Sequence, residues 1–535
     1  MILGIDFGTS FSLAAVCTDS GEVIPLLPPE SRGIPSLFYY DAWEGILVGE
    51  RAGEEGHGHE AKNLKRDIKL SLSSDFTADE KCFSARQIAG SILREVKDSA
   101  LMAAKKKGLP GEVESVVLAV PADFSENERL LLKQAAELPE AEGGPGLFVC
   151  GMIREPAAAA LTYFHRLDTT RPLTRNRGAE SRSGPILVYD LGGGTCDAAI
   201  LKKVESQSDS YMWNFQENST RPLARNRKVE SRFLVLDAEA VRIGGRDWDE
   251  RLTDYLEKES ARHFGMTLSD KPRYREMLKW EALRIKHAFS KKTGGKYPEK
   301  VLAVIEVNGR ECRIPVTRRL FDEMTQELFQ KTLRMVRKLL ERNASLRPDR
   351  ILCVGGGSHM PQVREGLKQA FPALDLQVCE PDFAVAFGAA LYAESLKKEQ
   401  PLLSDVAAFS YGIRAFTSYE QDPEDTVIVN LIRRLEPLPC SGHTTFMTGR
   451  RNEREISFEL YETVSGKEQF PYTNTLSPVM ELTLRLPPDV PKGEPIHVSL
   501  TLNPDGLILI LACDEHGHRI EGTIRRPVMD NNELF

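Results

Sequence analysis

The sequence has few cysteines and no pattern of them that indicates a disulfide framework or a zinc site. It contains nine, an odd number, and no two form a Cys-x-x-Cys pair. Secreted disulfide-rich domains and structural zinc sites use paired or closely spaced cysteines. We therefore expect reduced thiols and a cytoplasmic location.

Long apolar runs and an excess of positive charge are also absent. No run approaches the roughly 18 apolar residues that a membrane helix needs, and the segment MILGIDFGTS at residues 1–10 has no basic region typical of a secretion signal. The formal net charge is −8 and the pI about 5.9, which offers phosphate backbones no global attraction. The sequence thus predicts no membrane and no nucleic acid as partners.

The 535 residues, 41% hydrophobic and 28% charged, are typical of a globular protein of several domain-sized units. In the first 400 residues, apolar runs bounded by glycine alternate with stretches of helical periodicity, as in α/β folds. The expected strands are 2–5, 116–120, 186–189, 198–201 and 351–354, and the expected helices are 85–107, 126–137, 246–264 and 318–343. These patterns predict an α/β domain over residues 1–396.

Beyond residue 396, short alternating runs separated by proline and glycine replace the helical stretches. This texture predicts an antiparallel β-sandwich over residues 407–535, with strands at 426–432, 455–461, 480–486, 497–502 and 507–513. Residues 397–406 are charged and then apolar, as expected of a linker.

A basic segment at 170–182 recurs at 220–232. Charge runs are usually solvated, which favours two surface loops of common origin; a paired basic surface for a partner is the alternative.

Three glycine-rich turns follow predicted strands. In GIDFGTS, at residues 4–10, Gly8 allows close backbone approach to a phosphate while Thr9 and Ser10 add hydroxyl donors. YDLGGGTCD, at 189–197, supplies a second turn with Gly192, Gly193, Gly194 and Thr195. Two such turns can close on a polyphosphate from opposite sides, with Asp6 and Asp190 holding a hydrated Mg²⁺.

The third turn, VGGGSHMP at residues 354–361, joins a strand to a helix. Gly355, Gly356 and Gly357 would let a flat adenosine lie against the backbone; tight packing of strand against helix is the alternative explanation.

In this order, the three turns resemble the ATPase domain of the heat shock protein 70 (DnaK-like) family. The segments REPAAAAL at 154–161 and IGGRDWD at 243–249 favour this family over actins and sugar kinases, which share the fold. The resemblance implies a two-lobed, actin-like (ribonuclease H-like) ATPase domain with ATP and Mg²⁺ as cofactors. It also implies that Asp6, Asp190 and Asp197 organise Mg²⁺ and the attacking water, that Thr9, Ser10 and Thr195 contact phosphates, and that Glu155 completes the cage. A catalytic lysine is expected, with Lys69 preferred and Lys65 as the alternative.

The resemblance further implies adenosine contacts from Gly245, Lys286, Ser290, Gly355, Gly356 and Asp382, and nucleotide binding by Gly244. Two positions depart from the family. Leu283 stands where a glutamate is usual, and His359 replaces the arginine that stacks on adenine. His359 is thus either a stacking group or a solvated turn residue, and nucleotide affinity or base selectivity is expected to differ from the family.

The C-terminal segment resembles the peptide-binding sandwich of the same family more loosely. By that resemblance, an apolar groove for an extended peptide would be formed by Ile413, Phe416, Phe446, Ile456 and Phe458; each could equally be an inward sandwich residue. The sequence ends at Phe535, so we expect a lidless short form with fast peptide exchange. Gly151 and Arg154 depart from the surface that meets J-domain proteins, which puts dependence on such a protein in doubt.

Together these patterns predict a monomeric ATP-dependent chaperone whose ATP hydrolysis controls the binding of unfolded peptides, with a J-domain protein and a nucleotide exchange factor as candidate partners. The alternatives are a small-molecule kinase of the same superfamily and an ATP-binding scaffold for one dedicated partner. The pairs His57/His59 and His516/His518 lie in polar segments and are expected to be solvated rather than metal ligands.

Overall fold

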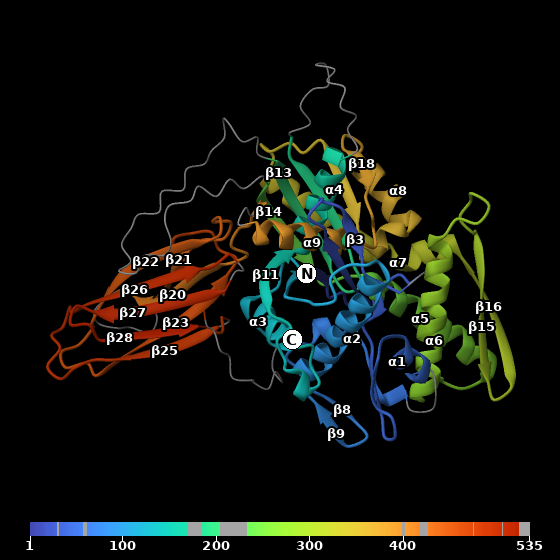
Figure 1. Ribbon diagram of the computed structural model, residues 1–535, viewed down its shortest axis with the longest axis horizontal. Coiled ribbons are helices and arrows are strands. Elements are labelled where there is room, and N and C mark those ends of the chain that lie inside the picture. Colours follow the sequence, from blue (N-terminus) through green and yellow to red (C-terminus); the bar gives the residue numbers. More distant parts are fainter. Residues whose placement is uncertain are drawn as a thin grey trace, which may run out of the picture. The chain divides into compact units, whose positions relative to one another are not determined.

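The computed structural model describes residues 1–28, 31–56, 61–169, 184–203, 233–398, 402–417, 426–473, 476–504 and 507–523. Both copies of the duplicated basic segment, 170–182 and 220–232, lie outside these residues, as do His57 and His59. By internal packing the chain divides into two compact units. Unit 1 comprises Met1–Asp123 and Leu132–Leu403, and unit 2 comprises Phe124–Leu131 and Ser404–Phe535. Figure 1 shows the helices and strands of each.

Unit 1 is built on two sheets, the first of which has six strands in the order β11-β10-β1-β2-β3, with β4 also pairing β2. Strands β1 and β10 are parallel, as are β10 and β11, whereas β1–β2 and β2–β3 are antiparallel. Strand β10 is buried at every position, as expected of an apolar run covered on both faces. The bounds of these strands are β1 Ile2–Asp6, β2 Phe11–Cys17, β3 Val23–Pro25, β4 Ile34–Pro35, β10 Ser115–Val120 and β11 Val149–Arg154.

The second sheet of unit 1 repeats this arrangement in the order β18-β17-β12-β13-β14-β19. Here β12 pairs parallel with β17 and β17 with β18, while β12–β13 and β13–β14 are antiparallel. The β1–β2 turn therefore has a structural counterpart in the β12–β13 turn. The bounds are β12 Ile186–Leu191, β13 Cys196–Lys203, β14 Phe233–Val241, β17 Arg350–Val354, β18 Asp375–Val378 and β19 Leu403–Ser404.

Helices α4 (Glu155–Thr169) and α9 (Ala384–Lys397) pack against one another and against the strands. Small residues make the crossing possible, because a Cβ on Gly388 would lie 1.8 Å from the carbonyl oxygen of Ala158. A Cβ on Gly4 would similarly lie 2.1 Å from the backbone nitrogen of Ala390. The alanine-rich segment at 157–160 is fully buried at this crossing, which explains its small side chains.

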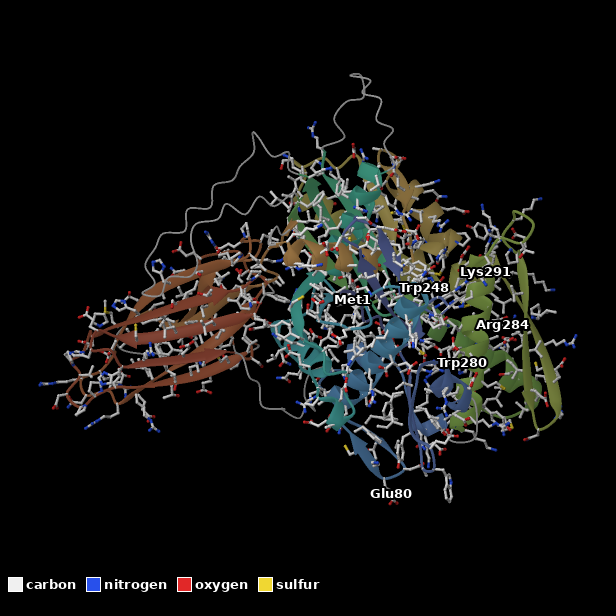
Figure 2. All side chains as sticks on the ribbon, viewed as in Figure 1. Met1, Glu80, Trp248, Trp280, Arg284 and Lys291 are labelled. Atoms are coloured by element: carbon white, nitrogen blue, oxygen red, sulfur yellow. The ribbon has the colours of Figure 1, made fainter. Side chains whose placement is uncertain are left out.

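The second sheet carries a helical layer whose core includes Trp248 of α5 (Gly245–Phe264), a side chain with no solvent exposure (Figure 2). Helix α6 (Pro272–Ser290) packs on α5 and on the β15–β16 hairpin. Helix α2 of the first half begins at Ser84, which forms a capping box with Gln87. The remaining elements of unit 1 are β5 Phe38–Asp41, β6 Gly45–Val48, α1 Gly49–Gly56, η1 Ala61–Asn63, β7 Leu64–Lys65, η2 Ile68–Leu70, β8 Phe76–Ala78, β9 Lys81–Phe83, α2 Ala85–Lys106, η3 Glu140–Glu142, β15 Lys300–Val307, β16 Arg310–Thr317, α7 Arg318–Arg342, η4 Gly356–His359 and α8 Pro361–Ala370. Helix α3 (Glu126–Ala136) has residues in both units.

Unit 2 contains two antiparallel sheets that enclose one apolar core. One has the order β24-β21-β20-β23-β25 and the other β22-β26-β27-β28. Inward residues of both sheets, such as Ile413, Leu460, Val498 and Ile510, belong to this core. The bounds are β20 Ser410–Phe416, β21 Thr426–Ile432, β22 Cys440–Met447, β23 Glu455–Thr463, β24 Gln469–Pro471, β25 Met480–Arg485, β26 Pro495–Leu502, β27 Ile508–Asp514 and β28 Arg519–Thr523.

The chain as a whole is thus a mixed α/β protein with several sheets. The predicted domain limits of 1–396, 397–406 and 407–535 stay a prediction; α9 ends at Lys397, and the described part of the predicted linker contains β19. None of the helices in the described ranges combines the length and apolar character that crossing a bilayer requires.

Candidate nucleotide site

The two structurally equivalent turns of unit 1 line the same pocket. Gly8, Thr9 and Ser10 come from the β1–β2 turn, and Gly192, Gly193 and Thr195 come from the β12–β13 turn. We call this region, together with Asp6, Lys69, Glu155 and Asp190, the turn end of the pocket. The pocket continues to a helix end formed by residues of α6, of η4 and of the segment 381–385, together with Arg32.

The glycines of the turns are required by close packing. A Cβ on Gly193 would lie 2.4 Å from the hydroxyl of Ser10, which belongs to the opposite turn. Gly355 has a φ of +78°, and a Cβ there would lie 2.3 Å from an oxygen of Asp190. Glycine is the residue that tolerates both the left-handed backbone and the close approach. These glycines are therefore needed for the close approach of the two turns and for the packing of Gly355 on Asp190.

Four carboxyl groups and one ammonium group meet at the turn end. Lys69, in η2, forms an ion pair with Glu155, the first residue of α4, and both side chains are buried. Burial raises the pKa of Asp6 to about 7, with Glu155 acting in the same direction and Lys69 against it. Burial alone would lower the pKa of Lys69, but the negative charges of Glu155 and Asp6 outweigh it and raise that pKa. The cluster is therefore short of positive charge.

Asp190 and Asp197 are the other two carboxyl groups. Burial raises the pKa of each, and the charge of Glu155 raises both further. One oxygen of Asp197 accepts a hydrogen bond of 2.6 Å from the backbone N–H of Ala122. The Oδ2 atoms of Asp190 and Asp197 are buried and have no hydrogen-bond partner within the described residues. Buried carboxylate oxygens without partners suit a hydrated cation, since Mg²⁺ binds oxygen ligands and keeps several of its waters.

Direct metal coordination by protein side chains alone has no support. Among the described residues, no group of three or more His, Cys, Asp or Glu side chains is arranged to hold a metal ion.

One face of α6 forms a wall of the helix end. Leu283, Lys286, His287, Ser290 and Lys291 line the pocket, at the three- and four-residue spacing that places side chains on one helix face. The ammonium group of Lys286 donates to the backbone oxygen of Gly245 at 2.8 Å and to Asp249 at 2.6 Å. Lys286 thus ties α6 to the start of α5.

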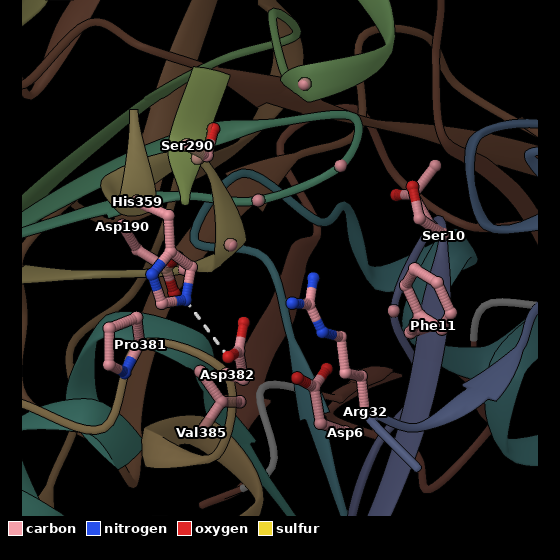
Figure 3. A pocket seen from close by; sticks show the side chains of 18 of the residues that line it. Asp6, Ser10, Phe11, Arg32, Asp190, Ser290, His359, Pro381, Asp382 and Val385 are labelled. Atoms are coloured by element: carbon pink, nitrogen blue, oxygen red, sulfur yellow. Dashed lines mark hydrogen bonds and ion pairs between the residues drawn. The ribbon is translucent and has the colours of Figure 1, made fainter. Parts of the chain in front are cut away.

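His359 and Asp382 also line the helix end. The Nε2 atom of His359 lies 3.0 Å from a carboxylate oxygen of Asp382, as the dashed line in Figure 3 marks. Burial alone would raise the pKa of Asp382, but the hydrogen bond and charge of His359, with the charges of Arg32 and His287, lower it. Burial lowers the pKa of His287 to about 4, and Lys286, Arg32 and Lys291 act in the same direction.

Most of the residues predicted for the nucleotide site line this one pocket. They are Asp6, Gly8, Thr9, Ser10, Lys69, Glu155, Asp190, Gly192, Gly193, Thr195, Gly245, Lys286, Ser290, Gly355, Gly356, Gly357, His359 and Asp382. Three others are not among the lining residues, namely Gly194, Gly244 and Asp197. Asp197 still belongs to the charged cluster, because its charge acts on the pKa of Lys69. A Cβ on Gly244 would lie 2.4 Å from the backbone nitrogen of Gly194, so the two glycines serve packing between turns. Lys65 lies outside the lining, 5.9 Å from the ring centre of Phe76.

Several lining residues were not expected from the sequence, namely Phe11, Leu13, Arg32, His287, Lys291, Met360, Pro381 and Val385. For His287 and Lys291 a signal existed, because they follow Leu283 at helical spacing. Arg32 precedes a two-residue strand and carries no local pattern that would have identified it.

The residues predicted for a peptide groove have different environments in unit 2. Ile413 and Phe458 are buried in the core shared by the two sheets. Phe446 and Ile456 are partly buried against that core, and the rings of Phe446 and Phe458 are 6.2 Å apart. Phe416 is 48% exposed. The structure thus brings four of the five together around one core and leaves Phe416 at the surface.

Comparison with known proteins identifies one family. A sequence model described as Hsp70 protein matches residues 59–207 and 235–532, which together make up well over half of the chain.

Individual relatives agree with this family match. The protein named Chaperone protein DnaK of Thermosipho africanus is 27% identical over 527 residues, covering 96% of this chain and 78% of the relative. The protein of the same name from Thermotoga petrophila is 28% identical over 529 residues, with the same coverage.

Proposed function

This chain belongs to the Hsp70 family of ATP-dependent chaperones, and from that premise we propose that it hydrolyses ATP in the pocket of unit 1 and thereby controls peptide binding by unit 2. In this proposal unit 1 is an actin-like ATPase domain and unit 2 a peptide-binding β-sandwich. The duplicated sheet arrangement of unit 1 and the shared core of the two sheets in unit 2 support these assignments. The single observation that carries the proposal is the pairing of two equivalent glycine turns in one pocket.

Binding of the triphosphate is assigned to the turn end. Backbone N–H groups of the two turns, with the hydroxyl groups of Thr9, Ser10 and Thr195, are suited to phosphate oxygens. Asp6 and Asp190 would hold a hydrated Mg²⁺, which would neutralise charge on the phosphates. The nucleoside is assigned to the helix end, whose lining includes Lys286, Ser290, Gly356 and Asp382.

Hydrolysis is assigned to the acidic cluster beside Lys69. The buried ion pair with Glu155 holds the ammonium group at the pocket, and we assign to it the last phosphate of a bound triphosphate. Asp197, held by the N–H of Ala122, would accept a hydrogen bond from the attacking water and orient it. A preorganised cation next to developing negative charge lowers the barrier most. The position of Lys69 in the pocket favours it over Lys65 as the catalytic lysine.

Peptide binding is assigned to unit 2. Phe446, Ile456 and Phe416 keep exposed surface that an extended apolar peptide could cover, whereas Ile413 and Phe458 would support them from the core. Main-chain hydrogen bonds from neighbouring loops would add affinity that does not depend on peptide sequence. Dependence on a J-domain protein or an exchange factor, a monomeric state and a cytoplasmic location remain predictions from the sequence.

The proposal is tested by ATP turnover of the full chain with and without a permanently unfolded protein such as reduced, alkylated lactalbumin. We expect slow basal turnover that the unfolded protein accelerates severalfold, and no turnover by an Asp190→Asn variant. Turnover that responds to sugars or small acids instead would identify a kinase. Absence of MgATP binding by folded protein would overturn the proposal.

A further inference from the structure

Arg32 is a charged side chain of the pocket to which nothing above assigns a role. It lines the helix end, its residue is exposed to solvent, and in Figure 3 its guanidinium group points into the middle of the pocket. Within the described residues it forms no hydrogen bond or ion pair with another side chain. A guanidinium group that has five donors and no hydrogen-bonded partner in the described part of the chain, and that lines a pocket, is available to a ligand.

The backbone around Arg32 is anchored. The hydroxyl of Ser31 donates to the carbonyl oxygen of Gly33 at 2.9 Å and accepts from the N–H of Gly33 at 3.2 Å. The next residues form β4, which pairs with β2, and the hydroxyl of Ser36 donates to the carbonyl oxygen of Gly8 at 2.7 Å. Arg32 is therefore held in register with the β1–β2 turn.

Across the pocket from this anchor lie groups of the second sheet and its helices. Arg32, His287 and Asp382 line the same pocket, and the charge of Arg32 contributes to the lowered pKa of both Asp382 and His287. Arg32 precedes the segment that forms β4 of the first sheet, whereas His287 belongs to α6 and Asp382 follows β18 of the second sheet. A ligand at the helix end would lie between them.

We propose that Arg32 stacks its guanidinium plane on the purine base of the bound nucleotide, so that the base lies between Arg32 on one side and the wall of Gly356 and His359 on the other. This inference rests on the proposed function. The phosphate-binding turns lie at the opposite end of the pocket, and the helix end offers a flat ring an apolar side chain, Leu283, and two imidazoles. Guanidinium groups are planar and weakly hydrated, and they stack readily on aromatic faces.

The test compares MgATP with inorganic tripolyphosphate and Mg²⁺, measured by calorimetry on the full chain. Arg32→Ala should weaken MgATP binding about tenfold, because a desolvated cation–π contact is worth roughly the 1.4 kcal/mol of a tenfold change. Tripolyphosphate, which has no base, should bind both proteins equally. Arg32→Lys should recover less than half of the lost affinity, since it keeps the charge but not the plane. Arg51→Ala, which removes an exposed arginine of α1 that is paired with Glu44, is the matched control and should change neither affinity.

Two results would overturn the inference while the proposed function stands. Unchanged MgATP affinity in Arg32→Ala would show that the side chain does not contact the nucleotide. An equal loss for MgATP and tripolyphosphate, with full recovery in Arg32→Lys, would place Arg32 on the phosphates instead. If the wild-type protein bound no MgATP, both this inference and the proposed function would be withdrawn.

Discussion

The two ends of the pocket in unit 1 are built in different ways. At the turn end, glycines and buried charged groups are locked together, so that Gly193 packs on Ser10 and Lys69 pairs with Glu155. At the helix end, the lining side chains are longer and mostly half-buried or exposed, as for His287, His359 and Arg32. A substitution at the turn end therefore disturbs several groups at once, whereas one at the helix end is expected to change single ligand contacts.

From this difference we assign ATP hydrolysis to the turn end and selectivity for the nucleotide to the helix end. Buried charges that cannot rearrange are suited to stabilising a transition state. Half-buried side chains whose protein contacts are few can be exchanged without loss of the fold. The comparison predicts large losses of turnover from changes at the turn end and moderate changes of affinity from changes at the helix end.

The largest effect is expected for Lys69→Ala. Removing a preorganised charge from an active site costs roughly 100- to 1,000-fold in rate, so single-turnover ATP hydrolysis should fall by about that factor while MgATP binding survives. Lys65→Ala is the matched control, because Lys65 lies nearby on β7 but outside the pocket lining. Equal turnover in Lys69→Ala and wild type would refute the assignment of the catalytic lysine.

A large loss of binding is expected for Gly355→Ala. The new Cβ would meet both an oxygen of Asp190 and the backbone oxygen of Leu191, 2.5 Å away, so the β12–β13 turn must shift. MgATP affinity should fall at least tenfold by calorimetry. Gly21→Ala controls for backbone strain, because Gly21 also has a positive φ, +83°, but a Cβ there meets nothing within 4 Å. If both variants bind MgATP like wild type, close packing at Gly355 is not needed for the site.

The sequence predicted the turn end better than the helix end for a physical reason. At the turn end, each glycine turn directly follows an apolar strand, so the signal is local. The strands predicted at 2–5 and 186–189 are observed as Ile2–Asp6 and Ile186–Leu191. Helix 318–343 was likewise predicted to within one residue of Arg318–Arg342. The helix end is assembled from residues far apart in the chain. Arg32 is more than 300 residues from His359 and Asp382, and no local pattern encodes their proximity.

In unit 2, the sequence could not separate groove residues from core residues. Alternation identifies which face of a strand is apolar, and β21 was predicted with its observed bounds, Thr426–Ile432. Whether an apolar side chain is covered by the facing sheet depends on the packing of two sheets. Ile413 is buried and Phe416 is exposed although both were predicted for the same groove.

A moderate effect is expected for His359→Arg at the helix end. An arginine at this position could still pair with Asp382 and would present a larger plane to a purine base, so MgATP affinity should rise about threefold, within the range of one exposed cation–π contact. His263→Arg, an exposed position near the end of α5, is the control for added charge. A weaker affinity in His359→Arg would mean that the imidazole itself is required, and the assignment of base stacking to this wall would be wrong.

The smallest effect concerns the pH dependence of stability and His287. Its pKa is about 4 in the folded protein because of burial and the charges of Lys286, Arg32 and Lys291, which Asp382 only partly offsets; an unfolded histidine has a pKa of about 6.5. Since the folded pKa is the lower one, the neutral imidazole contributes stability that is complete above about pH 6.5 and is lost as the pH falls towards 4.

Between pH 7 and pH 4.5, the Tm of the nucleotide-free protein should therefore fall further in wild type than in His287→Gln, by about 2 °C for a domain of this size. His263→Gln should follow the wild-type curve. Parallel curves for wild type and His287→Gln would show that protonation of this imidazole costs the folded state nothing, and the helix end would then be more open to water than its burial indicates.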